Sequence, residues 1–208
     1  MTKPIDIDSL THLLQDRGGD SRCITAIVGA PGSGKSTLSE ALAARMNATS
    51  PGSAAVFPMD GYHYDDMILN ARGWRARKGA PHTFDVGGFA AMLTRLSDNS
   101  EAEIAVPVFD RSIEIARNAA RIIPLSVRHV IVEGNYLLLD APGWRDLRNQ
   151  FDISVYLDVP PEELRRRLSE RWANVAPEER KMKLDGNDLP NAELVQSSSL
   201  PADFTVSD

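Results

Sequence analysis

The stretch CITAIVGAPGSGKST (residues 23–37) joins an apolar run, a glycine-rich turn and the start of a helical pattern. The apolar, β-branched run over residues 23–29 is typical of a parallel strand that is buried on both faces. Residues 29–36 match G-x-x-x-x-G-K-[ST], and the residues from Lys35 to Met46 carry apolar side chains at helical spacing. Because the pattern leaves a strand and opens a helix, it predicts a phosphate-binding loop.

The residue types of this loop suit the triphosphate of a nucleotide. Glycines let successive backbone N–H groups turn toward phosphate oxygens, and the helix N-terminus adds partial positive charge. Lys35 is expected to reach the β- and γ-phosphates, and the Ser36 hydroxyl to ligate Mg²⁺. We therefore expect ATP and Mg²⁺ as cofactors. The residues expected to bind the nucleotide are Gly29, Ala30, Pro31, Gly32, Ser33, Gly34, Lys35, Ser36 and Thr37.

Strands and helices alternate on either side of this stretch. Further strands are expected over residues 54–60, 129–135 and 152–159, two short strands over 104–109 and 120–125, and a last strand in the segment PADFTVSD. Helices are expected over residues 5–16 (capped by Asp6 or Asp8 and ended by Gly18-Gly19), around 89–96, near 144–149, from 161 to about 172, and from Pro177 to near Gly186. This order predicts an α/β fold with a doubly wound, mostly parallel sheet and helices on both faces, the P-loop NTPase fold.

The length of 208 residues fits a single domain spanning residues 1–208. Residues 61–85 lack periodicity, which indicates a long functional loop for the substrate. The segment near residues 160–175 is expected to form a lid. Two small domains divided near residue 100 are the alternative, but no linker-like stretch supports that division.

Composition narrows the class of protein further. Hydrophobic residues make up 42% of the chain and charged residues 25%, which is ordinary for a globular protein. The net charge of −6 argues against a nucleic-acid partner. The apolar runs are too short for a membrane span, and the acidic start MTKPIDID is unlike an export signal. The single cysteine, Cys23, is expected at a strand start, and its isolation favours a cytoplasmic location.

Two acids end predicted strands. Asp60 follows VFPM and Glu133 follows HVIV, so both are expected at the edge of the sheet that carries the phosphate-binding loop. Glu133 is expected to act on the magnesium side, directly or through water. Asp60 could orient and deprotonate an attacking hydroxyl. A helix cap or a solvated strand end is the alternative for either residue.

The expected lid carries Arg165, Arg166, Arg167 and Arg171. Arg167 and Arg171 are four residues apart and share a helix face, as in a mobile arm that closes over phosphates. Glu162, Glu163 and Glu170 lie at pairing distance along the same helix, so a solvated, ion-paired face remains the other interpretation.

These motifs together resemble the phosphoribulokinase, uridine kinase and bacterial pantothenate kinase group of P-loop kinases. The resemblance rests on GAPGSGKST (29–37), MDGYHY (59–64), RARKGAPHTFD (75–85), PVFD (107–110), VIVEGNYLLL (130–139) and the arginine-rich segment after DVP. Within the group, the chain is most similar to the branch labelled fructose transport system kinases or fructokinases. The resemblance implies a phosphotransferase that acts on an alcohol group, with a sugar as its substrate.

The resemblance also implies roles for single residues. Asp60 stands at the position of the general base, Glu133 at the Walker B acid, and Arg167 or Arg171 in the lid. Lys78-Gly79 matches a pantothenate kinase-like pair, whereas Arg111-Ser112 replaces the aromatic–His segment of uridine kinases. The residues expected at the substrate are Asp60, Tyr62, His63, Arg77, Lys78, His82, Phe84, Arg111 and Glu133. The residues expected to act in catalysis are Lys35, Asp60, Arg167 and Arg171.

Several alternatives remain open at this point. A nucleoside or pantothenate-type kinase would share these motifs. A regulatory GTPase is disfavoured because Asp85-Val86-Gly87-Gly88 follows no apolar strand and no N-K-x-D motif occurs. A non-kinase nucleotide-binding regulator is the remaining class. The sequence does not identify the hydroxyl acceptor, and it leaves the oligomeric state, a homodimer included, undecided.

Overall fold

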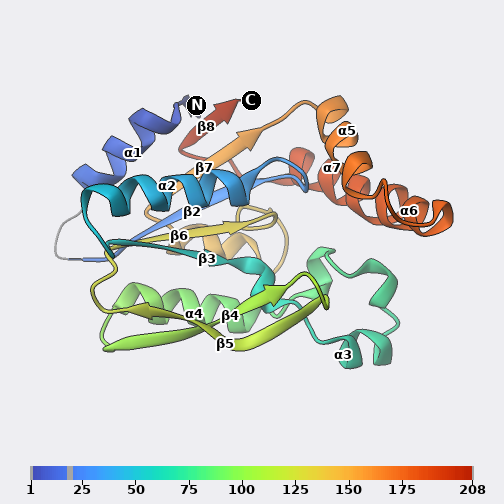
Figure 1. Ribbon diagram of the computed structural model, residues 1–208, viewed down its shortest axis with the longest axis horizontal. Helices are drawn as coiled ribbons and strands as arrows, with labels where there is room; N and C mark the ends of the chain where they lie inside the picture. Colours follow the sequence, from blue (N-terminus) through green and yellow to red (C-terminus); the bar gives the residue numbers. More distant parts are fainter. Residues whose placement is uncertain (1, 18–20, 208) are drawn as a thin grey trace.

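Six parallel strands form the centre of the molecule in the computed structural model, which describes residues 2–17 and 21–207 (Figure 1). Their order in the sheet is β1-β8-β7-β2-β6-β3, with every neighbouring pair parallel. The strands are β1 (Lys3–Pro4), β2 (Cys23–Gly29), β3 (Ala54–Pro58), β6 (His129–Gly134), β7 (Ile153–Asp158) and β8 (Phe204–Ser207). The predicted α/β fold with a parallel sheet is confirmed.

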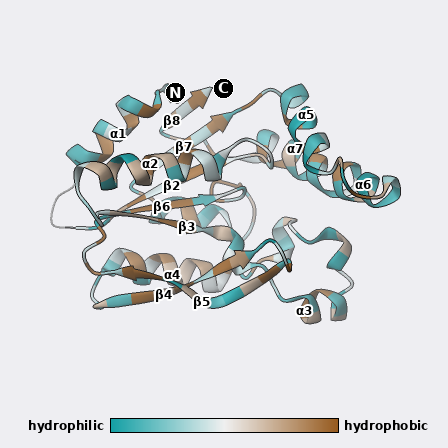
Figure 2. Ribbon diagram, viewed as in Figure 1, coloured by the Kyte–Doolittle hydropathy of each residue, from teal (hydrophilic) through white to brown (hydrophobic). Residues whose placement is uncertain are grey.

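Helices cover both faces of this sheet (Figure 1). The covering helices are α1 (Ile7–Asp16), α2 (Lys35–Thr49), α4 (Val86–Asp98), α5 (Pro161–Arg171) and α7 (Leu189–Ser198), whereas α3 (Asp66–Ala71) and α6 (Pro177–Lys183) lie away from the sheet. The sheet has one hydrophobic core on each face. Because side chains alternate along a strand, β2 contributes side chains to both. Ile27 packs with α1 and α2, whereas Ile24 and Val28 pack with α4, α5 and α7. In Figure 2 the hydrophilic colour is concentrated on α5 and α6, which lie at the rim of the molecule.

A separate antiparallel hairpin stands beside the main sheet. It consists of β4 (Glu103–Asp110) and β5 (Ile115–Pro124), and it matches the expected excursion of two short strands. The hairpin packs closely on the 3₁₀ turn η1 (Met59–Tyr62), because a Cβ on Gly61 would lie 2.6 Å from the carbonyl oxygen of Pro107. The buried guanidinium of Arg22 donates hydrogen bonds to the carbonyl oxygens of Leu96, Pro124 and Val127 and so ties the hairpin to the end of α4.

Several expected element ends differ from the structure. The strand expected over residues 54–60 ends at Pro58, because the chain turns into η1 there. The loop expected over residues 61–85 contains α3, whose N-terminus is capped by the Asp65 carboxylate, and two 3₁₀ turns, η2 (Arg75–Arg77) and η3 (Pro81–Thr83). The expected helical stretch near residues 144–149 is the 3₁₀ turn η4 (Arg145–Gln150).

The predicted end of the helix that begins at Pro177, near Gly186, was wrong. α6 runs through a π-helical turn (Leu184–Asp188, labelled η5) into α7, which was not expected as an element. Ala192 and Val195 of α7 are buried in the core, so tertiary packing continues the helix past a glycine that would otherwise favour its end.

The N-terminal helix agrees with expectation where it is described. The Asp6 carboxylate caps α1 by accepting a hydrogen bond from the Ser9 N–H, at 2.7 Å. The expected stop at Gly18-Gly19 lies outside the described residues. Across residues 2–17 and 21–207, no helix combines the length and apolar character needed to cross a membrane.

A substitution at Gly134 tests how closely the end of β6 packs against Met59. A Cβ at this residue would lie 2.6 Å from the Met59 Cβ and 2.8 Å from its Sδ, and Met59 is fully buried. Gly134→Ala is therefore expected to lower the free energy of unfolding by about 1–3 kcal/mol, measured by urea denaturation. Gly186→Ala is the matched control, because a Cβ there meets no atom within 4 Å. Equal urea midpoints for wild type and Gly134→Ala would contradict this packing.

Candidate active site

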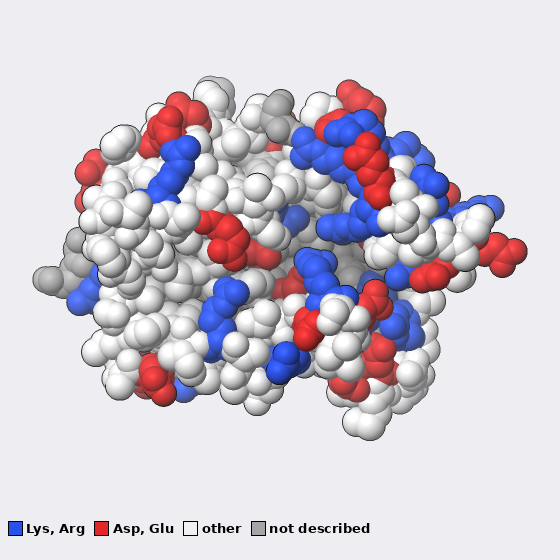
Figure 3. Space-filling model, in the orientation of Figure 1, with Lys and Arg blue, Asp and Glu red and all other residues white. Residues whose placement is uncertain are grey.

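The carboxyl ends of β2, β6 and β3 meet at one edge of the sheet. Val28 pairs with Gly134, and Glu133 pairs with Pro58, so the three strands end at nearly the same level. This edge opens into a cleft of about 1040 Å³. Figure 3 shows charged side chains gathered around the hollow. The topology therefore delivers the phosphate-binding loop and both strand-end acids to one place.

The phosphate-binding loop lines one end of the cleft. Gly32 and Gly34 have φ angles of +82° and +92°, in the left-handed region that favours glycine. Pro31, Gly32, Gly34, Lys35, Ser36 and Thr37 line the cleft. Gly29, Ala30 and Ser33 lie behind that lining, although they were expected at the nucleotide with the others. Gly29 is closely packed, because a Cβ there would lie 3.1 Å from the carbonyl oxygen of Leu157.

Lys35 is buried at the base of the cleft, with 8% of its surface exposed. Its Nζ donates to the carbonyl oxygen of Ala30 at 3.0 Å, which folds the side chain back over the loop. Burial lowers the pKa of the ammonium group from 10.5 to about 8, and the charges of Glu133 and Asp60 oppose that shift. A buried cation of this kind is stabilised further by any anion that enters the cleft.

Glu133 lies beside the first turn of α2. Its Oε1 accepts a hydrogen bond from the Ser36 Oγ at 3.2 Å. Burial, and next the charge of Asp60, raise the pKa of this carboxyl group, while Lys35 and Ser36 lower it. A hydroxyl oxygen and a carboxylate oxygen at this distance are the ligand types that Mg²⁺ prefers.

Asp60 faces the same cleft from η1. Its Oδ2 accepts a hydrogen bond from the Arg111 Nη2 at 2.9 Å, and its backbone carbonyl oxygen lies 2.8 Å from the His63 Nδ1. Burial lowers the pKa of the His63 imidazole, so this ring is neutral at neutral pH. Asp60 and Glu133 therefore line the same cleft as Lys35, as expected from the strand ends, and Arg111 of the hairpin joins them.

The residues expected at the substrate divide into two groups. His63, Lys78, Phe84 and Arg111 line the cleft with Asp60 and Glu133. Tyr62 is placed elsewhere: its ring packs edge-on against Phe57 and Phe89, at centroid distances of 5.9 and 5.2 Å, in the core. Arg77 and His82 are also outside the lining.

Arg77 and His82 have structural contacts instead. Arg77 donates to the carbonyl oxygen of Gly186 at 2.5 Å and to the Asn191 Oδ1 at 3.4 Å, so it ties the loop to η5 and α7. His82 is exposed and stacks edge-on against Trp74 at 5.0 Å. These two residues therefore contact other parts of the protein and lie outside the cleft lining.

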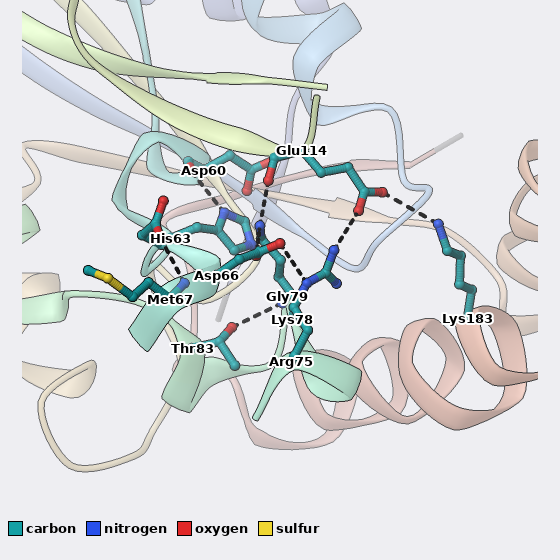
Figure 4. Close-up of polar contacts among 11 residues, drawn as sticks. Asp60, His63, Asp66, Met67, Arg75, Lys78, Gly79, Thr83, Glu114 and Lys183 are labelled. Carbon is teal, nitrogen blue, oxygen red and sulfur yellow. Dashed lines mark hydrogen bonds and ion pairs between the residues drawn. The ribbon is translucent and has the colours of Figure 1, made fainter. Parts of the chain in front are cut away.

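The structure adds residues that the sequence did not mark. Asp66, Arg75, Glu114 and Lys183 form a connected set of ion pairs with Lys78 (Figure 4). They come from α3, η2, the hairpin tip and α6, and no sequence spacing links these segments. Of the four, only Arg75 lies within a motif quoted from the sequence, RARKGAPHTFD (75–85).

The arginine-rich helix α5 also divides. Arg167 and Arg171 line the cleft, whereas Arg165 and Arg166 do not. Arg166 pairs with Glu163 and Glu170 on the exposed side of the helix, at 2.6 and 2.7 Å. The ion-paired interpretation is therefore confirmed for Arg166, whereas the lid role of Arg167 and Arg171 stays a prediction.

Comparisons with known proteins agree with this geometry. A family model described as an AAA domain matches residues 26–184. A "Putative uridine kinase" of Schizosaccharomyces pombe is 32% identical over 194 residues, covering 89% of this chain and 83% of that protein. The solved structure of a "putative fructose transport system kinase" from Silicibacter sp. TM1040 has a TM-score of 0.88 at 42% identity, covering 97% of this chain and 98% of that one.

A third relative widens the group. A pantothenate kinase of Listeria monocytogenes is 31% identical over 114 residues, which cover 54% of this chain and 37% of that protein. The chain therefore belongs to the phosphoribulokinase, uridine kinase and pantothenate kinase group of P-loop kinases. It is a phosphotransferase that binds ATP and phosphorylates a hydroxyl group of a small molecule.

The lowered pKa of Lys35 predicts proton uptake on nucleotide binding. The folded protein loses this proton above pH about 8, while bound phosphates raise the pKa again. ATP affinity is therefore expected to weaken above pH 8 by up to about tenfold per pH unit. Without ligand, the Lys35 contribution to the free energy of unfolding rises with pH between about 8 and 10.5, because the unfolded chain holds the proton longer.

Calorimetry at pH 9 in two buffers of different ionisation enthalpy measures this proton uptake. Lys35→Met is the control, since it removes the titrating group while keeping a side chain of similar length. A buffer-independent binding enthalpy for the wild type would contradict the assignment.

Proposed function

We propose that this kinase transfers the γ-phosphoryl group of Mg²⁺–ATP to a hydroxyl of a small sugar, a fructokinase-like reaction. The observation that carries the proposal is the position of Asp60, which faces the phosphate-binding loop on one side and an aromatic, hydrogen-bonding pocket on the other. In this proposal residues 1–208 act as one kinase domain, with the acceptor loop at 61–85 and a lid at 160–175.

The residues present fit a magnesium ion. Ser36 and Glu133 offer adjacent oxygen ligands beside the phosphate-binding loop. No group of three acidic, histidine or cysteine side chains in the described chain could bind a metal alone. Mg²⁺ would therefore complete its shell with phosphate oxygens and water, its usual arrangement at such sites, and supply charge neutralisation there.

Asp60 is proposed as the general base. The Arg111 contact occupies Oδ2, and no donor to Oδ1 is found within residues 2–17 and 21–207. The acceptor oxygen attacks the γ-phosphorus, and its proton passes to the Asp60 carboxylate. The new O–P bond forms as the bond to the β–γ bridging oxygen breaks, and its electron pair leaves with ADP.

The lid arginines are proposed to act on the transferred phosphoryl group. A Cβ on Gly34 would lie 3.9 Å from the Arg167 Nη1, so the guanidinium stands directly over the phosphate-binding loop. Arg167 is also oriented by Glu163, whose Oε1 accepts from its Nε at 2.6 Å. Positive charge at this place stabilises the charge that spreads over the equatorial oxygens during transfer.

The side chains that line the proposed acceptor pocket are of the types that bind a sugar. The His63 ring packs at a tilt against Phe84 and Phe109, with centroid distances of 4.0 and 4.7 Å, and the three rings form an aromatic wall. Asn187 and Asn191 bring amide groups to the same cleft. A polyhydroxyl compound offers C–H faces to rings and hydroxyls to polar groups, so this lining suits it. The Silicibacter relative, whose name refers to fructose transport, points the same way.

A substrate panel tests the proposal. The purified protein is incubated with ATP and Mg²⁺ and with sugars, nucleosides or pantothenate, and ADP release is followed. A sugar is expected to give the highest kcat/KM. A higher value for a nucleoside or pantothenate would overturn the sugar assignment. ATP hydrolysis that no acceptor accelerates would overturn the proposed transfer reaction.

Asp60→Asn isolates proton transfer, because the amide keeps the size of the side chain and removes its charge. We expect kcat to fall by about 10²–10⁴-fold with little change in ATP affinity. Asp65→Asn is the matched control: it is exposed, caps α3 and lies outside the cleft lining. A kcat for Asp60→Asn within threefold of wild type would move the base elsewhere.

Substituting arginines on each face of α5 distinguishes the role of the cleft-facing side from that of the exposed side. Arg171→Ala is expected to lower kcat by about tenfold or more while raising the acceptor KM less, since its charge acts on the transition state. Arg166→Ala, on the exposed face, is expected to stay within about twofold of wild type. Equal steady-state constants for the two variants would return the helix to a purely structural role.

A further inference from the structure

The acceptor end of the cleft contains four cationic side chains, and each has a carboxylate partner. Arg111 pairs with Asp60 at 2.9 Å, and Lys78 pairs with Asp66 at 2.6 Å. Arg75 lies 2.7 Å from Asp66 and 3.3 Å from Glu114 (Figure 4). Lys183 pairs with Glu114 at 3.4 Å and with Glu179 at 3.3 Å. The cations of this region are therefore neutralised by the protein itself.

A further carboxylate lines the cleft between Arg171 and Lys183. Asp188 lines the cleft, and its Oδ2 accepts a hydrogen bond from the neutral Trp172 Nε1 at 2.8 Å. Lys35, Arg167 and Arg171 line the other end of the cleft, around the phosphate-binding loop. At that end the loop and the N-terminus of α2 favour a polyanion, whereas the acceptor end offers no net positive charge.

Glu114 is central to the neutralisation. It stands at the tip of the β4–β5 hairpin with a φ of +53°, a backbone conformation that is uncommon for a residue other than glycine. Its backbone carbonyl accepts a hydrogen bond from the Lys78 Nζ, and its carboxylate meets Arg75 and Lys183 from two other segments. Figure 4 shows the Arg75 and Lys183 side chains pointing toward this carboxylate. These contacts hold the hairpin tip in place and offset the free-energy cost of the left-handed backbone conformation at Glu114.

We infer that Glu114 is a specificity-determining residue that restricts the acceptor to uncharged polyhydroxyl compounds. This inference rests on the proposed sugar kinase function and narrows it. A carboxylate- or phosphate-bearing acceptor would have to displace Glu114 from Arg75 and Lys183, or approach its negative charge at close range. A neutral polyol can instead hydrogen-bond to the paired groups without separating them.

The experiment compares matched acceptor pairs with the wild type and Glu114→Gln. Each pair consists of a neutral sugar and its phosphorylated or carboxylate counterpart, and kcat/KM is measured for both. The wild type is expected to prefer the neutral member. Glu114→Gln is expected to shift the ratio toward the anionic member by about tenfold or more, because Arg75 and Lys183 lose a neutralising partner. Glu103→Gln, an exposed site at the far end of the same hairpin, should leave the ratio unchanged.

A binding measurement separates this inference from the proposed function. With the phosphate-binding loop filled by a non-hydrolysable ATP analogue, calorimetry measures the affinity of a sugar phosphate. Tighter binding to Glu114→Gln than to wild type is expected even if no tested acceptor is turned over. Equal affinities, or a wild type that already prefers the anionic member, would refute the inference while leaving phosphoryl transfer intact. Should Glu114→Gln fail to fold, Asp66→Asn removes the other partner of Arg75 and carries the same expectation.

Discussion

The burial of the Lys35 ammonium group beneath the phosphate-binding loop is the constraint around which the cleft is organised. A cation that is 8% exposed, with its Nζ bonded to a single carbonyl oxygen, is costly unless negative charge stands near it. Glu133 and Asp60 supply that charge, and both raise the pKa of Lys35 against the effect of burial. The parallel register of β2, β6 and β3 brings these groups to one edge of the sheet. The phosphate groups of a nucleotide would add negative charge beside the Lys35 ammonium group. Nucleotide binding and the stability of the buried lysine are therefore coupled.

Charge is distributed unevenly along the cleft, and this follows from topology. The phosphate-binding loop at the nucleotide end comes from one continuous segment, β2 to α2, whose backbone and Lys35 favour a polyanion. The proposed acceptor end is assembled from α3, η2, the β4–β5 hairpin and α6, which meet through ion pairs between residues far apart in the chain. Those ion pairs fix the geometry of the pocket and at the same time remove its net positive charge. The shape of the pocket and its proposed charge selectivity therefore depend on the same contacts.

The parts of the site that lie on local patterns were predictable from the sequence. The phosphate-binding loop has a fixed spacing, and Asp60 and Glu133 follow apolar runs whose strand ends share an edge in any parallel sheet. Tyr62 was misplaced because the 3₁₀ turn η1 directs its ring into the core against Phe57, which no linear pattern shows. Glu114 was missed because its partners are 39 and 69 residues away. The continuation of α6 into α7 likewise depended on tertiary packing.

The most direct test of this account is a crystal structure of the complex with a non-hydrolysable ATP analogue, Mg²⁺ and a neutral sugar. The account predicts the γ-phosphate within hydrogen-bonding distance of the Lys35 Nζ and an acceptor hydroxyl between that phosphate and the Asp60 carboxylate. It also predicts that Glu114 keeps its contacts with Arg75 and Lys183 in the complex. A sugar bound away from Asp60, or a nucleotide whose phosphates avoid Lys35, would contradict it.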